Sequence, residues 1–133
     1  MLINKKDVIG INKEIGCTGQ FSNESSLDFA LSIVKQKKSW LFELSYIARS
    51  LLVNHIFQDG NKRTVSAIII FYLEQKNYNY NKEKITNVIL SMYRKNINDI
   101  IKLENSSFRM PKKVPPFLSI NKIMRLIKNV IDI

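Results

Sequence analysis

A helical pattern between Asn61 and Lys76 is apolar on almost every side. Its main face is formed by Val65, Ile68, Ile69, Tyr72 and Leu73, and the remaining sides also carry Ala67, Ile70 and Phe71. A helix that is apolar all round lies buried at the centre of a protein, because water would contact its side chains anywhere else. The segment therefore predicts a central helix that other helices surround.

The rest of the chain shows amphipathic helical periodicity and no strand alternation. We expect helices over residues 5–15, 24–36, 39–57, 82–96 and 97–103, and an amphipathic one after Ser119. Asn4 is the expected N-cap of the first helix, and Ser22 or Asn23 of the second. Residues 16–23 are predicted to form a loop anchored by Phe21, and residues 77–81 a turn. The predicted fold class is all-α.

Bulk properties indicate one domain followed by a tail. A chain of 133 residues can bury a core, and we expect that domain to cover residues 1–104. All three prolines lie within residues 105–118, which predicts a linker before a C-terminal helix that packs on the domain or on a partner. Cys17 is the only cysteine and no apolar leader is visible, so a reducing, cytoplasmic location is expected.

The formal net charge of +10 leaves several kinds of partner open. Nucleic acid, an anionic membrane surface, an acidic protein or a phosphorylated ligand would each complement it, but much of the lysine is scattered, so nucleic acid is not favoured. The longest apolar run, Ala67 to Leu73, is too short to span a bilayer, and no membrane partner is expected. Homo-oligomerisation is left open.

A polar stretch separates the predicted helices 39–57 and 61–76. Asp59, Gly60 and Asn61 form a turn that opens the central helix, whose first N–H groups favour an anion. Gly60 would let a ligand approach the backbone closely. Lys62 and Arg63 lie in the first helical turn, where cations are unfavourable unless a highly charged anion lies among them. The stretch therefore predicts a phosphate site.

Two further residues of the stretch extend this prediction to catalysis. Phosphate would repel Asp59 unless its carboxylate holds Mg²⁺ that bridges phosphate oxygens. His55, at the end of a core-facing stripe, would look into the molecule or into a cleft, and is the candidate general base. The structural alternative is a solvated turn with Asn61 as N-cap, Asp59 in an Asx-turn and two surface cations.

Other motif interpretations have less support. Residues 60–64 lack the earlier glycine and the preceding strand of a P-loop. One histidine and one distant cysteine are too few for a zinc site. Nothing in the sequence supports a catalytic pair of Cys17 and His55.

Residues 55–64, His-x-Phe-x-Asp-Gly-Asn-Lys-Arg-Thr, resemble the signature of the Fic/Doc (Fido) family. The Gly16-x-x-Gly19 loop, the helix after it and the chain length are similar to the death-on-curing (Doc) branch, and the resemblance covers about residues 1–104. It implies an all-α Fido-type bundle with the motif loop between two central helices. The loop at residues 16–23 is similar in position to the family's flap, which aligns the target segment.

The resemblance also implies roles for the motif residues. His55 would activate a target hydroxyl, Asp59 would hold Mg²⁺, and Phe57 would anchor the loop in the core. The phosphates of ATP, the implied co-substrate, would be bound by Gly60, Asn61, Lys62 and Arg63.

Two positions favour the Doc branch over protein AMPylation. AMP-transferring Fic proteins usually have a glycine at the position of Lys62 and a second arginine at the position of Ser66. The implied activity is transfer of a phosphoryl group from ATP to a target protein, such as a translation factor like elongation factor Tu. Gly60 is the more Fic-like choice and keeps AMPylation as an alternative. A non-catalytic nucleic-acid-binding or scaffold module is a third, supported by the net charge.

The sequence also bears on regulation. Many Fic proteins carry an inhibitory Ser/Thr-x-x-x-Glu-Gly/Asn segment. Ser39 and Glu43 have the spacing, but Leu44 follows them, and Glu104 has Ile100 four residues before it. Neither site fits, so the resemblance implies a separate antitoxin protein.

Overall fold

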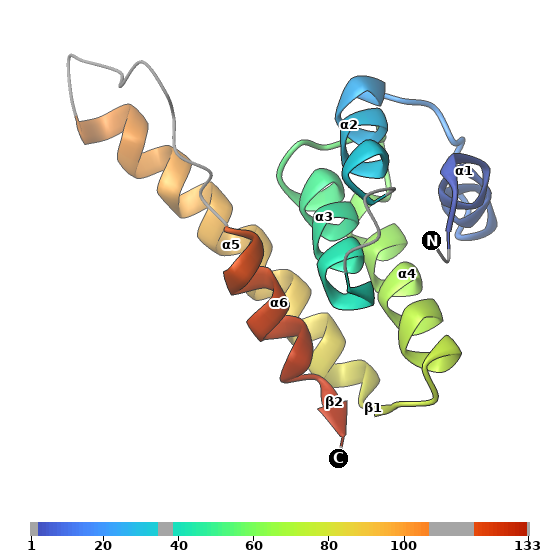
Figure 1. The fold of residues 1–133 in the computed structure, drawn as a ribbon. Coiled ribbons are helices and arrows are strands. Elements are labelled where there is room, and N and C mark those ends of the chain that lie inside the picture. Colours follow the sequence, from blue (N-terminus) through green and yellow to red (C-terminus); the bar gives the residue numbers. More distant parts are fainter. Residues whose placement is uncertain (1–2, 35–38, 107–118, 133) are drawn as a thin grey trace.

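The computed structural model describes residues 3–34, 39–106 and 119–132. The described part is mostly helical, with two very short strands (Figure 1). In chain order the elements are α1 (Lys5–Glu14), α2 (Glu24–Val34), α3 (Trp40–Leu52), α4 (Asn61–Gln75), β1 (Asn79–Tyr80), α5 (Lys82–Ser106), α6 (Ile120–Lys128) and β2 (Ile131–Asp132).

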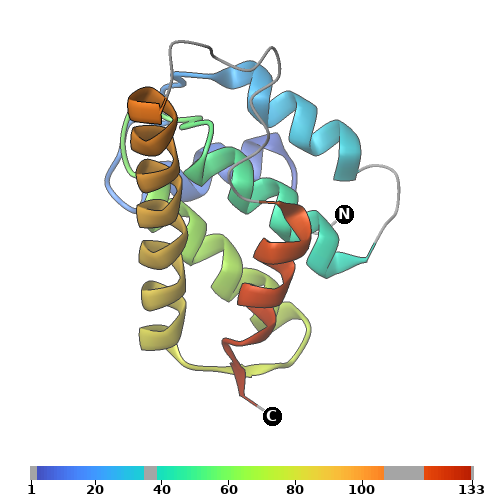
Figure 2. The ribbon, with the colours of Figure 1, turned by 90° about the vertical axis from the view of Figure 1, so that its left-hand side faces the viewer.

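The central pair of helices is α3 and α4, which pack against each other. Helix α3 also contacts α2 and α6, while α4 contacts α1 and α5. Figure 2 shows α5 standing along one side of the molecule, with β1 and β2 together at its lower end. The strands pair antiparallel, Asn79 with Asp132 and Tyr80 with Ile131. They join the end of the chain to the turn after α4.

The core lies between α3, α4 and the helices around them. Its fully buried side chains include Leu44, Ile47, Leu51, Ile68, Ile69, Leu73, Ile85 and Ile123. Burying one such side chain contributes about 1.5–3 kcal/mol. Ile127 of α6 is also fully buried, so α6 packs as part of this core, and the loop between α3 and α4 stands on a rigid base.

Several predicted elements are confirmed. Helix α1 begins after Asn4, whose side chain forms a capping box with Asp7. Helix α4 covers the segment predicted as the central helix. Ser119 is the N-cap of α6, and its side chain accepts the Lys122 N–H. In each case the capping residue or the apolar periodicity is a local property that sequence reveals.

Other predicted boundaries are wrong. Helix α3 ends at Leu52 and not at residue 57, because the backbone of residues 56–58 pairs with residues 20–23 instead of continuing the helix. Helix α5 runs without a break to Ser106, since no glycine or proline interrupts it and asparagine is only a weak helix breaker. The predicted helices 82–96 and 97–103 are therefore one helix, which also contains residue 104; the domain limits themselves stay a prediction.

Three other expectations have different outcomes. The predicted turn at residues 77–81 contains strand β1, which sequence did not reveal. The prolines and the end predicted for the second helix lie outside the described residues. Within the part of the chain that the structure describes, no helix is both long and apolar enough to cross a membrane.

Candidate active site

The loop between α3 and α4 is paired with the loop that follows α1. Ser22 and Asn23 each donate a backbone N–H to the Ile56 carbonyl, at 2.7 and 2.9 Å, and Gln58 donates to the Gln20 carbonyl at 3.1 Å. These bonds hold the backbone of residues 56–58 extended beside residues 20–23, the second half of the loop predicted at residues 16–23, and we keep the name flap for residues 20–23 alone. The flap therefore fixes the course of the motif loop.

Phe57 anchors this loop in the core. Its side chain is 1% exposed and stacks on Phe21 of the flap, with the ring centroids 5.2 Å apart. Ile56, which precedes it, is also fully buried, whereas Gln58, which follows it, is exposed. The loop therefore enters the core at residues 56 and 57 and returns to the surface at residue 58.

Asn61 closes the loop from the side of α4. Its Oδ1 accepts the Phe57 N–H at 3.0 Å, and its Nδ2 donates to the Phe57 carbonyl at 2.9 Å. The N-cap of α4 is Gly60, and no side chain caps the helix, so the alternative with Asn61 as N-cap is wrong. Because the Asn61 amide is occupied by the loop, the group that Asn61 offers to an anion is its backbone N–H.

The N-terminus of α4 concentrates positive charge. The first backbone bond of the helix runs from Thr64 N–H to the Gly60 carbonyl, and within the described residues nothing accepts the N–H groups of residues 61–63. The first turn contains no acidic residue, and both Lys62 and Arg63 are exposed. The helix dipole adds to these charges, so the site favours an anion.

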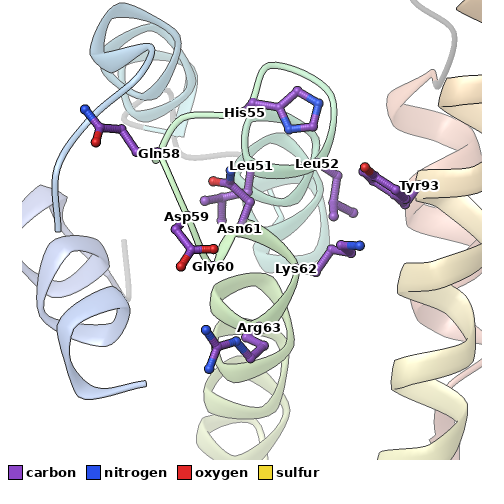
Figure 3. Close-up of a pocket in the computed structure, with 10 residues that line it drawn as sticks. All are labelled: Leu51, Leu52, His55, Gln58, Asp59, Gly60, Asn61, Lys62, Arg63 and Tyr93. Carbon is purple, nitrogen blue, oxygen red and sulfur yellow. The ribbon is translucent and has the colours of Figure 1, made fainter. Parts of the chain in front are cut away.

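A cavity of about 260 Å³ opens over this helix terminus. Figure 3 shows its lining, with Asp59 and Arg63 on the side of α1 and His55, Lys62 and Tyr93 on the side of α5. The full lining is Leu51, Leu52, His55, Gln58, Asp59, Gly60, Asn61, Lys62, Arg63 and Tyr93. Six of the residues that sequence singles out, all but the buried Phe57, therefore line one cavity.

The α5 side of the cavity is held by ring contacts. His55 is exposed and adopts a left-handed backbone with φ of 47°, so the prediction that it ends a core-facing helical stripe is wrong. Its imidazole lies edge-on to Tyr93, with centroids 6.3 Å apart. The Lys62 ammonium lies 4.0 Å from the centroid of the same tyrosine ring. Tyr93, a residue of α5, is thus the side chain that contacts both the candidate base and the cation.

The α1 side is held by polar contacts. Arg63 donates from Nη1 to the Ile15 carbonyl at 3.1 Å and from Nη2 to Cys17 Sγ at 3.4 Å. The Ile15 carbonyl lies at the C-terminus of α1, where the helix dipole attracts a cation. The Cys17 thiol lies 3.8 Å from Asp59 Oδ2. A guanidinium has five N–H donors, so three remain for a ligand.

Gly60 is required by the protein itself. Its φ is 79°, a conformation that side chains disfavour, and an added Cβ would lie 2.5 Å from Cys17 Sγ. The contact comes from the α1 side and not from the cavity. The fold therefore requires glycine at position 60, whichever phosphate of a nucleotide would bind in the cavity.

The sequence analysis did not single out four residues that line the cavity, Leu51, Leu52, Gln58 and Tyr93, nor Asn12 beneath the motif loop. Tyr93 follows the buried Ile89 by four residues, and Asn12 follows the buried Val8 by four, so both lie near buried faces of their helices. This four-residue spacing could have indicated that both side chains lie close to the core. Cys17 contacts Asp59 and Arg63 and shows no contact with His55, so the structure gives a Cys17–His55 pair no support.

The geometry suits chemistry on a phosphorylated ligand. An anion at the α4 terminus would meet free N–H groups and two cations, with an imidazole in the same cavity. Among the described residues no cluster of three metal-ligating side chains occurs, but Mg²⁺ in phosphate sites commonly takes one or two carboxylates together with phosphate oxygens. The exposed Asp59 carboxylate fits that use.

The chain was compared with protein-family models, with curated proteins and with solved structures. None of the three comparisons finds a match. A functional proposal therefore depends on the geometry of the cavity and on the resemblance of residues 55–64 to a known signature.

Proposed function

We propose that the protein is a Doc-like toxin of Fido-type fold that transfers the γ-phosphoryl group of ATP to a hydroxyl of a target protein. The observation that carries the proposal is that His55 shares one cavity with the free N-terminus of α4 and with Lys62 and Arg63. A base and an anion cradle within one hollow are the parts that phosphoryl transfer needs, since its catalysis is mostly positioning and charge stabilisation.

The reaction follows from these positions. The His55 imidazole accepts the proton of the target hydroxyl, whose oxygen forms a bond to the γ-phosphorus of ATP. The bond from that phosphorus to the bridging oxygen breaks, and ADP leaves. The backbone N–H groups of residues 61–63 and the side chains of Lys62 and Arg63 hold the phosphate oxygens. Mg²⁺ held by Asp59 would offset part of their negative charge.

The surroundings of the cavity bear on substrate and control. The flap lies against the motif loop through backbone bonds, where it is suited to align an extended segment of a target protein beside His55. We infer a translation factor such as elongation factor Tu as the target class, and a separate antitoxin as the inhibitor. Both inferences rest on the resemblance to the Doc branch.

The test uses ATP labelled separately at the α and γ phosphates, with cell extract and purified translation factors as targets. We expect γ label on a protein, an added mass of one phosphate on the intact target, and loss of both with His55→Asn. Label from the α position alone would establish nucleotidyl transfer instead. No transfer, together with salt-dependent RNA or DNA binding that survives His55→Asn, would indicate a non-catalytic module.

A further inference from the structure

Asn12 lies beneath the motif loop and is 1% exposed. Its Nδ2 donates to the Asp59 carbonyl at 3.0 Å and to Thr64 Oγ1 at 3.1 Å. Its Oδ1 accepts the Gly19 N–H at 2.9 Å. Both amide hydrogens and the amide oxygen are therefore engaged, and a buried amide would cost about 1–3 kcal/mol for each partner it lacked.

The three partners of Asn12 belong to three different segments. Gly19 lies in the loop that leads to the flap, Asp59 in the motif loop and Thr64 in the first turns of α4. Asn12 itself comes from α1, so one side chain joins the four segments around the α1 side of the cavity. The Asp59 carbonyl is the one partner that belongs directly to a residue lining the cavity.

Fixing the Asp59 carbonyl sets the positions of the groups that follow it. The peptide that carries this carbonyl continues into Gly60, whose left-handed backbone turns the chain into α4. A net change of ψ at Asp59 or of φ at Gly60 that moved this carbonyl would also turn the Asp59 carboxylate relative to the N–H groups of residues 61–63. These are the groups that an anion and its cation would contact.

We propose that Asn12 is a positioning residue of the candidate site: by holding the Asp59 carbonyl it keeps the Asp59 carboxylate and the α4 N-terminus turned toward the same cavity. This inference rests on the proposed function where it concerns phosphoryl transfer. The bond network itself is independent of that function. Asn12 does not line the cavity, so its effect on a ligand would pass through its bond to the Asp59 carbonyl.

Two substitutions separate positioning from ordinary structural support. Asn12→Asp keeps an acceptor for Gly19, and the Thr64 hydroxyl can turn to donate to the new carboxylate, but the bond to the Asp59 carbonyl becomes a repulsion. Thr64→Val removes only the Thr64 contact and is close in shape. Both variants lose stability, while only the first disturbs Asp59. Ser50→Ala, which removes a buried hydroxyl bonded to the Ile47 carbonyl, is the matched control.

The readouts are Mg·ATP affinity by calorimetry, kcat and KM for transfer, and hydrogen exchange of the hydrogen-bonded backbone amides of Phe57, Gln58 and Thr64, all well below each variant's melting temperature. For Asn12→Asp we expect Mg·ATP affinity to fall about 10–100-fold, as for lost partners of metal ligands, with faster exchange of these amides. Thr64→Val should change affinity far less, and Ser50→Ala should leave all readouts at wild-type values.

The outcomes separate this inference from the proposed function. If Asn12→Asp and Thr64→Val lower affinity and speed exchange equally, Asn12 is structural only and the inference is overturned. If the wild-type protein neither binds Mg·ATP nor transfers phosphate, the proposed function is overturned. Exchange of the Phe57, Gln58 and Thr64 amides then still decides whether Asn12 positions the loop, because it needs no ligand.

Discussion

On its α1 side the candidate site is held by hydrogen bonds, whereas on its α5 side it is held by ring contacts. Asn12, Arg63 and the flap form directed bonds of about 2.7–3.1 Å to backbone groups. His55 and Lys62 instead meet the face or edge of Tyr93. A directed bond fixes an atom closely, while an exposed cation over a ring is worth only about 0.5–1 kcal/mol.

This difference suggests a division of labour. Arg63, Asp59 and the start of α4 lie on the rigid side, where preorganised groups can stabilise charge without rearranging. The candidate base and Lys62 lie on the side that can adjust when a target segment arrives. Disruption of the α1 side should therefore impair ligand binding, and disruption of the α5 side should impair the chemical step.

The largest effect is expected for His55→Asn. Asparagine tolerates the left-handed backbone of residue 55, so the loop should keep its course while the base is lost. Transfer should fall by ~10²–10⁴-fold, with Mg·ATP affinity nearly unchanged. Rates are measured by γ-label transfer, with Asn54→Ala as the neighbouring control. A variant with a near wild-type rate would remove His55 from the mechanism.

Arg63→Met tests the opposite side of the cavity. It removes a charged partner of phosphate and the bond to the Ile15 carbonyl, and a bond to a charged group is worth about 1.5–3 kcal/mol. Mg·ATP affinity measured by calorimetry should fall about 10–100-fold. Arg94→Met makes the same charge change on an exposed residue outside the cavity lining. Equal losses in both variants would mean that net charge, and not the site, binds the nucleotide.

Gly60→Ala tests how tightly the α1 side is packed. The added Cβ would meet Cys17 Sγ at 2.5 Å in a backbone with φ of 79°, so we expect a loss of about 1–3 kcal/mol of stability. Gly16→Ala carries similar backbone strain, with φ of 97°, but no atom lies within 4 Å of its Cβ. Urea unfolding of the two variants isolates the clash, which Cys17→Ala should relieve in the double variant. Equal losses of stability in Gly16→Ala and Gly60→Ala would mean that the α1 side accommodates the added Cβ without a clash.

The sequence predicts those parts of the site that are local. Helix α4 follows from apolar periodicity, and the motif residues that line the cavity are nearly consecutive in the chain. Asn12 could not be paired with Asp59, because 47 positions separate them and periodicity carries no information on which faces meet. The end of α3 was misplaced for a similar reason: pairing with the distant flap overrides the local helical pattern.

Tyr72, further along α4, gives a reference outside both sides of the site. It is fully buried, and within the described residues its hydroxyl has no hydrogen-bond partner. Tyr72→Phe should therefore raise stability by up to about 1 kcal/mol near neutral pH and leave transfer unchanged. Calorimetric melting and the γ-label assay check these outcomes. A fall in transfer would mean that the core of α4 controls the site.

The same residue gives a pH dependence with a definite sign. Burial, and then the charge of Glu43, raise the pKa of Tyr72 above its ordinary value. Above about pH 10 the tyrosine ionises in the unfolded state but keeps its proton in the folded state. The unfolded state is thereby favoured, so the free energy of unfolding falls as pH rises above this value. Urea unfolding from pH 8 to 11 should show wild type losing stability relative to Tyr72→Phe. Parallel curves would show that burial of the phenol is not linked to folding.

The smallest effect is expected for Tyr93→Leu. Leucine keeps an apolar side chain beside His55 and Lys62 but removes the ring, which forfeits about 0.5–1 kcal/mol of cation–π attraction at an exposed site. kcat should fall by no more than a few-fold and Mg·ATP affinity should be unchanged, as kinetics and calorimetry can show. A large loss of affinity would mean that Tyr93 contacts the nucleotide directly. The α5 side would then be part of the binding site and not an adjustable wall, and the contrast between the two sides would fail.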